Sequence, residues 1–135
     1  MSRTDLDDLT LEATASSPAV EARAAQGLLR IRGEAYPENA FAFFSPVLAW
    51  TEAFLAKGPA PLRVELELTY LNTSSIKSMM DLMDLLQEAF DGGRDVGLAW
   101  FYDPENDRAL DLAEEFREDL TLPFDIVPRA AEGLP

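Results

Sequence analysis

The chain is 135 residues long and carries 25 acidic against 11 basic residues, so its formal net charge of −14 works against binding to nucleic acid or to an anionic membrane. Its hydrophobic content of 47% excludes a disordered chain, and the length suits one domain over residues 1–135 without a signal peptide or transmembrane run, which predicts a cytoplasmic protein. Cysteine and histidine are absent, which excludes disulfides, thiolate zinc sites, a cysteine nucleophile and a histidine base.

The N-terminal part is expected to form short strands. Residues 1–7 are polar and predicted to be loose. A short edge strand is predicted at 9–11, where leucine alternates with threonine. The ranges 19–24 and 28–33 alternate on either side of a turn at Gly27, and this pattern predicts a β-hairpin.

A loop over 33–39 leads into the first predicted helix, with Asn39 as its N-cap. Apolar residues at helical spacing then cover 40–56. Because Pro46 lies inside this range, it either kinks the helix or marks its first turn, with the helix proper beginning near Ser45, and we expect an irregular first turn. Three aromatic residues off the apolar stripe either wrap the core or form an exposed contact patch for a partner: Phe41, Phe43 and Trp50.

The clearest strand of the chain covers 62–71. Apolar and polar residues alternate along it, which indicates one buried face. The residues expected on that face are Leu62, Val64, Leu66, Leu68 and Tyr70. A helix over 75–91 is predicted next, because apolar residues recur every three or four positions from Ile76 to Phe90.

Small polar residues occupy the junction between this strand and this helix. The hydroxyls of Thr73, Ser74 and Ser75 are expected at the helix N-terminus, which favours anions through its free N–H groups and partial positive charge. A hydroxyl that carries phosphate would be well placed there. Helix capping alone is the alternative interpretation, since these residue types are common caps.

The last third of the chain continues the alternation of strands and helices. Residues 96–102 predict a strand, and Asn106 or Asp107 is expected to cap a third, strongly acidic helix. The apolar stripe of that helix is Ala109, Leu112, Ala113 and Phe116. A short last strand is predicted around 124–128, and the tail over 129–135 is expected to be loose.

The order of the predicted elements indicates an α/β fold. Strands that alternate with helices require crossover connections, which predict a largely parallel arrangement after the initial hairpin. The strand at 62–71 has one polar face, whereas buried parallel strands are usually apolar on both. We therefore expect a mixed sheet with helices mainly on one face.

The junction also carries a resemblance to known proteins. Asn72-Thr73-Ser74-Ser75 is similar to the phosphorylation loop of STAS domains, which reads approximately Asp-Ser-Ser-Gly. A closer resemblance, to the SiaC family of STAS-like biofilm-regulation phosphoproteins of bacteria, covers nearly the whole chain. It is carried by Ser17-Pro18-Ala19, Gly33-Glu34-Ala35-Tyr36-Pro37-Glu38-Asn39, Tyr70-Leu71-Asn72-Thr73-Ser74-Ser75-Ile76-Lys77, Tyr102-Asp103 and Glu114-Glu115-Phe116-Arg117-Glu118-Asp119.

The resemblance to the SiaC family implies a STAS-like single domain that acts as a switch and not as an enzyme. It implies that the unphosphorylated form binds and activates a diguanylate cyclase, raising cyclic di-GMP in biofilm and aggregation signalling. A Ser/Thr protein kinase would phosphorylate the threonine of the Asn-Thr-Ser-Ser loop, Thr73 here, and a PP2C-like phosphatase would restore it. This chain itself would need no cofactor and no metal.

The residues expected to contact partners lie in two segments. Around the phosphorylation site they are Asn72, Ser74, Ser75 and Lys77, of which Lys77 is either a local phosphate contact or a solvated surface lysine. The second segment is Tyr36, Pro37 and Glu38. It would lie at the same end of the sheet as Thr73 if the strand before it runs parallel to 62–71.

The sequence alone leaves two alternative functions open. One is an anti-sigma factor antagonist of a partner-switching system, and another is an enzyme that uses Ser or Thr as nucleophile, with a Ser–Lys dyad formed by this loop and Lys77. The acidic spacing over 103–107 lacks the glycine and the later glutamate of a calcium loop, so it is interpreted as a turn. The acidic residues over 114–119 indicate a solvated helix face or a docking surface for a basic partner.

Overall fold

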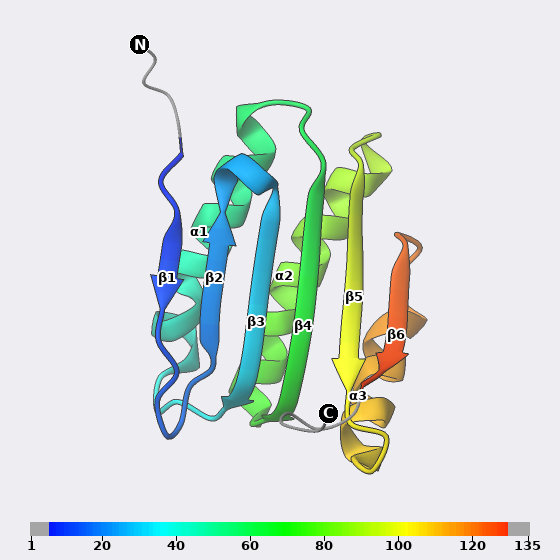
Figure 1. Cartoon of the computed structure of the whole chain (residues 1–135). Helices are drawn as coiled ribbons and strands as arrows, with labels where there is room; N and C mark the ends of the chain where they lie inside the picture. The colour runs from blue at the N-terminus through cyan, green and yellow to red at the C-terminus, as the bar shows by residue number, and fades with distance from the viewer. Residues whose placement is uncertain (1–5, 130–135) are drawn as a thin grey trace.

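The computed structural model of the chain describes residues 6–129, and Figure 1 shows its architecture. Within that range, one sheet has its strands in sequence order: β1 (Leu9–Leu11), β2 (Ala19–Arg23), β3 (Leu28–Ala35), β4 (Leu62–Leu71), β5 (Val96–Tyr102) and β6 (Phe124–Pro128). The helices are α1 (Ala40–Lys57), α2 (Thr73–Asp91) and α3 (Asp107–Glu118). These elements match the α/β order that the sequence predicts.

The sheet is mixed. Strands β1, β2 and β3 pair antiparallel, whereas β3, β4, β5 and β6 pair parallel. The predicted hairpin is therefore confirmed, with a 3₁₀ turn at Ala24–Gln26 and a left-handed Gly27 between its arms. The parallel half follows from the helical crossovers, because a parallel pair cannot be closed by a short turn.

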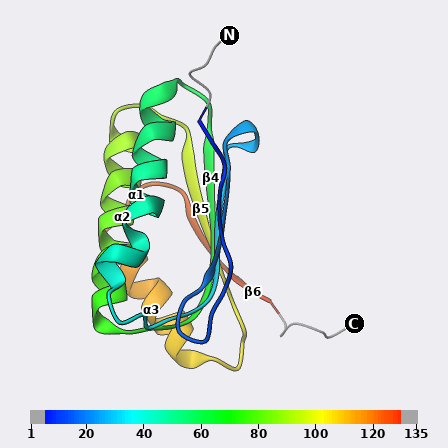
Figure 2. The ribbon, with the colours of Figure 1, turned by 90° about the vertical axis from the view of Figure 1, so that its left-hand side faces the viewer.

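All three helices lie on one face of the sheet, as the sequence predicts, and Figure 2 shows the other face uncovered. The core fills the space between the sheet and the helices. Its largest fully buried side chains include Trp100, Phe44, Leu29, Ile31 and Met79. A sheet covered on one side explains why β4 alternates apolar and charged residues, since only one of its faces leaves water.

The predicted loose ends fall mainly outside the described residues. Within the described range, hydrogen bonds fix a residue near each end of the chain. Trp50 Nε1 donates a hydrogen bond of 3.0 Å to the backbone oxygen of Asp7. Arg129 donates one of 3.0 Å to Glu67 and pairs its backbone N–H with Tyr102.

A register shift interrupts the pairing of β3 with β4. Gly33 lies opposite Leu68, but Glu34 lies opposite Tyr70, so Thr69 is an extra residue in β4. An extra residue reverses the alternation beyond it. Leu71 is consequently buried and the Tyr70 side chain is 48% exposed. The prediction that Tyr70 lies on the buried face was wrong for this reason.

Helix α1 corrects a second expectation. It begins at Ala40 and continues through Pro46, without the predicted late start near Ser45. A proline here leaves the carbonyl of Ala42 without its helical partner, and both residues are exposed, so water can solvate that group. The three aromatic residues off the apolar stripe of this helix do not share one environment, so neither core packing nor an exposed contact patch describes all of them. Trp50 is buried, Phe43 is half-buried and Phe41 is 72% exposed.

Candidate functional site

The three helices begin at the same end of the sheet. Because β3, β4 and β5 are parallel and each precedes a helix, α1, α2 and α3 all begin at the carboxyl ends of these strands, as Figures 1 and 2 show. Each helix has an asparagine N-cap whose side-chain oxygen accepts a backbone N–H. The pairs are Asn39 with Ala42 (3.0 Å), Asn72 with Ser75 (2.9 Å) and Asn106 with Ala109 (3.1 Å).

At the start of α2, the three hydroxyls have different environments. The N-cap is Asn72, so Thr73 and Ser74 are the first helical residues and both side chains are exposed. Ser75 departs from the expectation that it contacts a partner. Its side chain is buried, and Ser75 Oγ has no hydrogen-bond partner among the described residues. Only two of the three hydroxyls can therefore be reached from solvent.

The electrostatic setting of Thr73 favours an added negative charge. The first turn of α2 contains no acidic residue, so the partial positive charge of the helix N-terminus is not already neutralised there. Lys77 lies one turn further along the helix and is exposed. Asn72 occupies the N–H of Ser75, which leaves the N–H groups of Thr73 and Ser74 directed out of the helix end.

The segment with Tyr36, Pro37 and Glu38 lies beside this helix start. The parallel pairing of β3 and β4 meets the condition for that adjacency, and the Asn72 N–H donates to the Ala35 carbonyl at 2.9 Å. Tyr36 and Glu38 are exposed and Pro37 is half-buried. The Tyr36 hydroxyl donates to the Ala15 carbonyl at 2.7 Å, which fixes the ring at the surface.

Sequence reasoning missed the aromatic partner of Tyr36. The rings of Tyr36 and Tyr70 meet edge to face with centroids 6.0 Å apart, next to Asn72 and Thr73. The bulge at Thr69 turns Tyr70 toward solvent, and the side chain of Asn106 donates to the Thr69 carbonyl at 3.3 Å. A bulge is hard to foresee, but the consecutive apolar residues that end this strand depart from strict alternation and were a usable signal.

Exposed large hydrophobic side chains gather around these helix starts. The described residues of this kind are Tyr36, Phe41, Tyr70 and Met80. Tyr70 lies three residues before Thr73 and contacts Tyr36, Phe41 is in the first turn of α1, and Met80 lies two turns into α2. Exposed large apolar side chains of this kind are typical of a contact surface for another protein.

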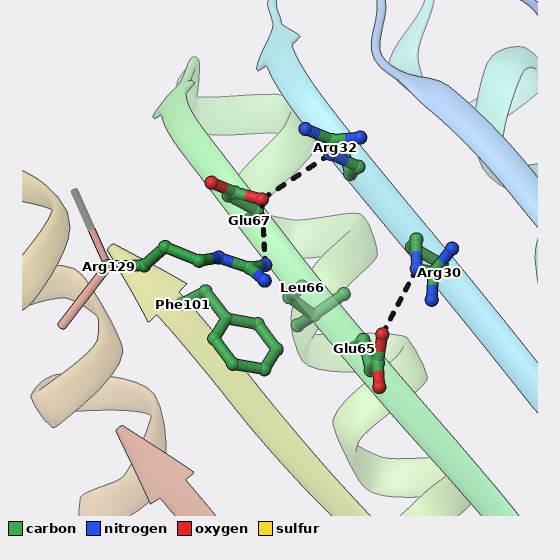
Figure 3. Close-up of a pocket in the computed structure, with 7 residues that line it drawn as sticks. All are labelled: Arg30, Arg32, Glu65, Leu66, Glu67, Phe101 and Arg129. Carbon is green, nitrogen blue, oxygen red and sulfur yellow. Dashed lines mark hydrogen bonds and ion pairs between the residues drawn. The ribbon is translucent and has the colours of Figure 1, made fainter. Parts of the chain in front are cut away.

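A hollow lies on the uncovered face of the sheet, where Figure 3 shows its charged side chains. Arg30 pairs with Glu65 at 3.0 Å, and Arg129 pairs with Glu67 at 3.0 Å while its guanidinium lies 3.9 Å from the ring centre of Phe101. The hydrogen bond to Glu65 raises the pKa of Arg30 above its usual value. Arg30 and Glu65 pair across the neighbouring strands β3 and β4, whereas Arg129 reaches past β5 to Glu67 on β4. These charges satisfy each other, so the hollow is occupied by a network of ion pairs.

Three further features of the described residues concern membrane spans, metal ligands and the Ser75 hydroxyl. Among the helices of residues 6–129, none combines the length and apolar composition that crossing a bilayer requires. The same range contains no group of three or more acidic side chains placed to hold a metal ion. The buried Ser75 hydroxyl, unpartnered within these residues, also removes the hydroxyl of a Ser75–Lys77 dyad from solvent.

Comparison with known proteins agrees with this geometry. Residues 11–129 match the family described as SiaC family regulatory phosphoprotein. An uncharacterized protein of Pseudomonas aeruginosa strain UCBPP-PA14 is 51% identical over 121 residues, which cover 90% of this chain and 96% of that protein.

Solved structures extend the similarity to the whole fold. Apo-SiaC from Pseudomonas aeruginosa is 50% identical and superposes with a TM-score of 0.87, covering 90% of this chain and 98% of that one. SiaC in the crystal structure of the diguanylate cyclase SiaD with its activator, from the same species, is 51% identical, with a TM-score of 0.88 and coverage of 90% and 100%.

Proposed function

The chain belongs to the SiaC family of regulatory phosphoproteins, and from that premise we propose that its unphosphorylated form binds and activates a diguanylate cyclase and that phosphorylation of Thr73 switches this activity off. The observation that carries the proposal is the exposed Thr73 side chain at the N-terminus of α2, three residues after Tyr70 of the exposed Tyr36–Tyr70 pair. As a regulatory phosphoprotein, the chain is an activator rather than an enzyme.

The first step of the argument is that the fold tolerates the modification. Phosphate adds roughly −1.5 to −2 charges at neutral pH. The N-terminus of α2 has no acidic residue in its first turn, so it gains about 0.3–1 kcal/mol from a nearby anion at an exposed site. The N-cap is Asn72, not Thr73, so esterification of Thr73 leaves the cap hydrogen bond in place. The modified protein should keep its architecture.

The second step is that a partner packed over Thr73 does not tolerate phosphate on this residue. An apolar contact over Tyr36, Tyr70 and Thr73 would have to remove water from a dianion, at a cost of several kcal/mol unless it supplies Arg or Lys in good geometry. Each 1.4 kcal/mol changes affinity about tenfold. This cost exceeds the gain from the helix terminus, so the switch would block an interface without refolding the domain.

The third step concerns the partners. The relative crystallised with the diguanylate cyclase SiaD supports a cyclase over the anti-sigma kinase that the sequence leaves open. A Ser/Thr protein kinase and a PP2C-like phosphatase would set the phosphorylation state, and both would reach Thr73 from solvent. Ser74 is also exposed, so the family resemblance of the Asn-Thr-Ser-Ser loop is what selects Thr73 over its neighbour.

A reconstitution tests the proposal. Purified SiaD from Pseudomonas aeruginosa is assayed for cyclic di-GMP synthesis with the wild-type chain, with Thr73→Asp, with chain phosphorylated only at Thr73, and with Ser74→Ala as the matched control. We expect activation by the wild type and by Ser74→Ala, and loss of activation with the other two. Equal activation by wild type and Thr73-phosphorylated chain would contradict the switch. Peptide mass spectrometry of chain from native cells should find phosphate on residue 73.

A further inference from the structure

The uncovered face of the sheet collects arginine side chains in a chain that has 25 acidic residues. Along β2, β3 and the first part of β4, buried residues alternate with more exposed ones, so every second side chain points away from the helices. Five of the eleven basic residues of the chain lie on this face: Arg23, Arg30, Arg32, Arg63 and Arg129. In a protein of net charge −14, such a cluster is a place where an anion can bind.

The hollow on this face is built on three neighbouring strands. Its charged and aromatic lining consists of Arg30, Arg32, Arg129, Glu65, Glu67 and Phe101. The arginines of β3 stand on one side of β4, and Phe101 of β5 with Arg129 stands on the other, as Figure 3 shows. Because adjacent strands lie about 4.8 Å apart, the two walls are about 10 Å apart. The volume of the hollow, about 320 Å³, is within the ~300–1,000 Å³ of ligand pockets.

The carboxylates lie deeper in the hollow than the guanidinium groups. The side chains of Glu65 and Glu67 are 27% and 26% exposed. Those of the three arginines are more exposed, at 38% to 50%. A ligand that enters from solvent therefore meets guanidinium groups first and carboxylates behind them.

The ion pairs leave a surplus of hydrogen-bond donors. A guanidinium has more donors than a carboxylate has acceptor positions, and here three arginines face two glutamates. Arg32 and Arg129 both direct a nitrogen at Glu67 Oε1, at 3.4 and 3.0 Å. Exposed ion pairs are weak, so a ligand can replace one of them at small cost. The surplus favours a ligand that has several acceptors and a negative charge.

The two carboxylates narrow the choice of anion. Glu65 and Glu67 would repel inorganic phosphate or an acidic peptide, and they need ligand groups that donate. Guanine offers both kinds of group, because its O6 and N7 accept from arginine while its N1–H and N2–H₂ donate to a carboxylate. Adenine accepts at N1, where guanine donates, so it matches this lining less well.

Arg129 adds a planar surface for a base. Its guanidinium lies over Phe101, 3.9 Å from the ring centre, and the side chain is 49% exposed. Nucleobases stack on guanidinium planes as they do on aromatic rings. Since Arg129 also reaches Glu67, a base stacked on it would have its edge near that carboxylate.

We propose that this hollow binds a guanine nucleotide, with the base on Arg129, its donor edge on Glu67 and a phosphate on Arg30. Two guanine nucleotides accompany a diguanylate cyclase, its substrate GTP and its product cyclic di-GMP. The net charge of −14 favours cyclic di-GMP, which carries less negative charge than GTP. One guanylate half would enter the hollow, so the activator would respond to the product of its partner. The choice of nucleotide rests on the proposed function.

Isothermal titration calorimetry with the full-length, unphosphorylated chain tests this site. Cyclic di-GMP should bind, and cyclic di-AMP, which has the same backbone, should bind at least about tenfold more weakly, as expected for one good base contact. Arg30→Ala and Arg129→Ala should each weaken cyclic di-GMP binding about tenfold or more. Arg23→Ala is the matched control, because it removes the same charge from the same face on β2, two strands from the carboxylates of β4. It should change binding less than about threefold.

Amide chemical shifts of the wild-type chain provide a readout without substitutions. Cyclic di-GMP should shift the amides of 30–32, 65–67 and 101 more than those of α1. Tighter binding of GTP with the same shifts would support the site and assign it the substrate of the cyclase.

Three results would overturn the proposal: equal binding of cyclic di-GMP and cyclic di-AMP, pyrophosphate binding as tightly as cyclic di-GMP, or no binding of either guanine nucleotide. Because these titrations contain no cyclase, each of the three leaves the activation of SiaD to be judged by its own reconstitution. A failed reconstitution would in turn leave the measured nucleotide affinities unchanged.

Discussion

The ring of Tyr70 meets the ring of Tyr36 edge to face, with centroids 6.0 Å apart, where uninterrupted alternation along β4 would have buried Tyr70. The extra residue Thr69 produces this arrangement, and it also sends Leu71 into the core. Tyr36 is held from the other side by its hydrogen bond to Ala15. A register shift thus builds the aromatic surface beside Thr73.

The Tyr36–Tyr70 contact should be measurable in the stability of the free protein. In a double-mutant cycle with Tyr36→Ala and Tyr70→Ala, we expect a coupling of about 0.5–1.5 kcal/mol in the free energy of unfolding, measured with urea. Tyr36→Phe is the control. It removes only the hydroxyl bond to Ala15 and should keep the coupling to Tyr70. Coupling near zero would show that the rings do not interact in solution.

Mutations should distinguish the helix cap, Asn72, from the proposed phosphorylation site, Thr73, by their effects on stability. Asn72→Ala removes the side-chain oxygen that accepts the Ser75 N–H, so it should lower the free energy of unfolding by about 0.5–2 kcal/mol. Thr73→Ala removes an exposed side chain outside the cap and should stay within about 0.5 kcal/mol of wild type. Urea unfolding of both variants gives the comparison. The opposite ranking would make Thr73 the cap.

A negative charge at residue 73 should not destabilise the fold. Thr73→Asp adds a carboxylate at the N-terminus of α2 and should raise the free energy of unfolding by about 0.3–1 kcal/mol at low ionic strength. The gain should nearly vanish in 1 M salt, where the Debye length falls to about 3 Å. Urea titrations at the two salt concentrations measure it. A salt-independent loss of stability would mean that modification perturbs the domain itself.

Two glycines should respond differently to alanine. Gly27 has φ of 60°, and a Cβ there would lie 2.3 Å from the carbonyl oxygen of Pro61, so Gly27→Ala should cost about 1–3 kcal/mol or more. Gly58 has an extended backbone and nothing within 4 Å of such a Cβ. Gly58→Ala should therefore be neutral or stabilise by up to about 1 kcal/mol. Thermal unfolding of the pair tests this contrast.

Gln87 should hold the segment after α3. Gln87→Ala removes its bonds to Thr121 and Leu122, and we expect a loss of about 1–3 kcal/mol in the free energy of unfolding. Faster amide exchange should appear at residues 121 and 122. Gln87→Glu keeps an acceptor for those two N–H groups but places a second carboxylate near Asp91, its present partner. It should protect the amides better than Gln87→Ala does.

Much of the fold could be predicted from local patterns. The alternation of β4 from Leu62 to Leu68, the strand over 96–102, the turn at Gly27 and the cap Asn39 each depend on neighbouring residues alone, and the structure confirms them. The course of α1 could not be predicted, because tolerance of Pro46 depends on whether the Ala42 carbonyl faces water. That exposure is a property of the packed molecule.

The candidate site divides in the same way. The exposed helix start at Thr73 and its proximity to Tyr36 followed from the strand-to-helix order and the parallel pairing. The burial of Ser75 did not, since a change of 100° around a helix axis separates the surface from the core. Both Met79 and Met80 fall in the apolar spacing from Ile76 to Phe90 that predicts α2, although only Met79 is buried. Two adjacent apolar residues widen a helix stripe beyond one packing face, and this was the available signal that one of the two methionines is exposed.

The extra residue Thr69 changes which residues of β4 face the core: the even-numbered residues up to Leu68 are buried before it, and the odd-numbered Leu71 is buried after it. Closing the bulge at constant chain length would extend the first pattern, folding Tyr70 inward and pushing Leu71 into water. A chain shortened by Thr69 would instead form a regular pleat with Tyr70 still outward and Leu71 still inward, because Leu68 and Tyr70 would then be consecutive. The aromatic surface should therefore survive deletion of this residue, whereas a slip of the pairing by one position would erase it.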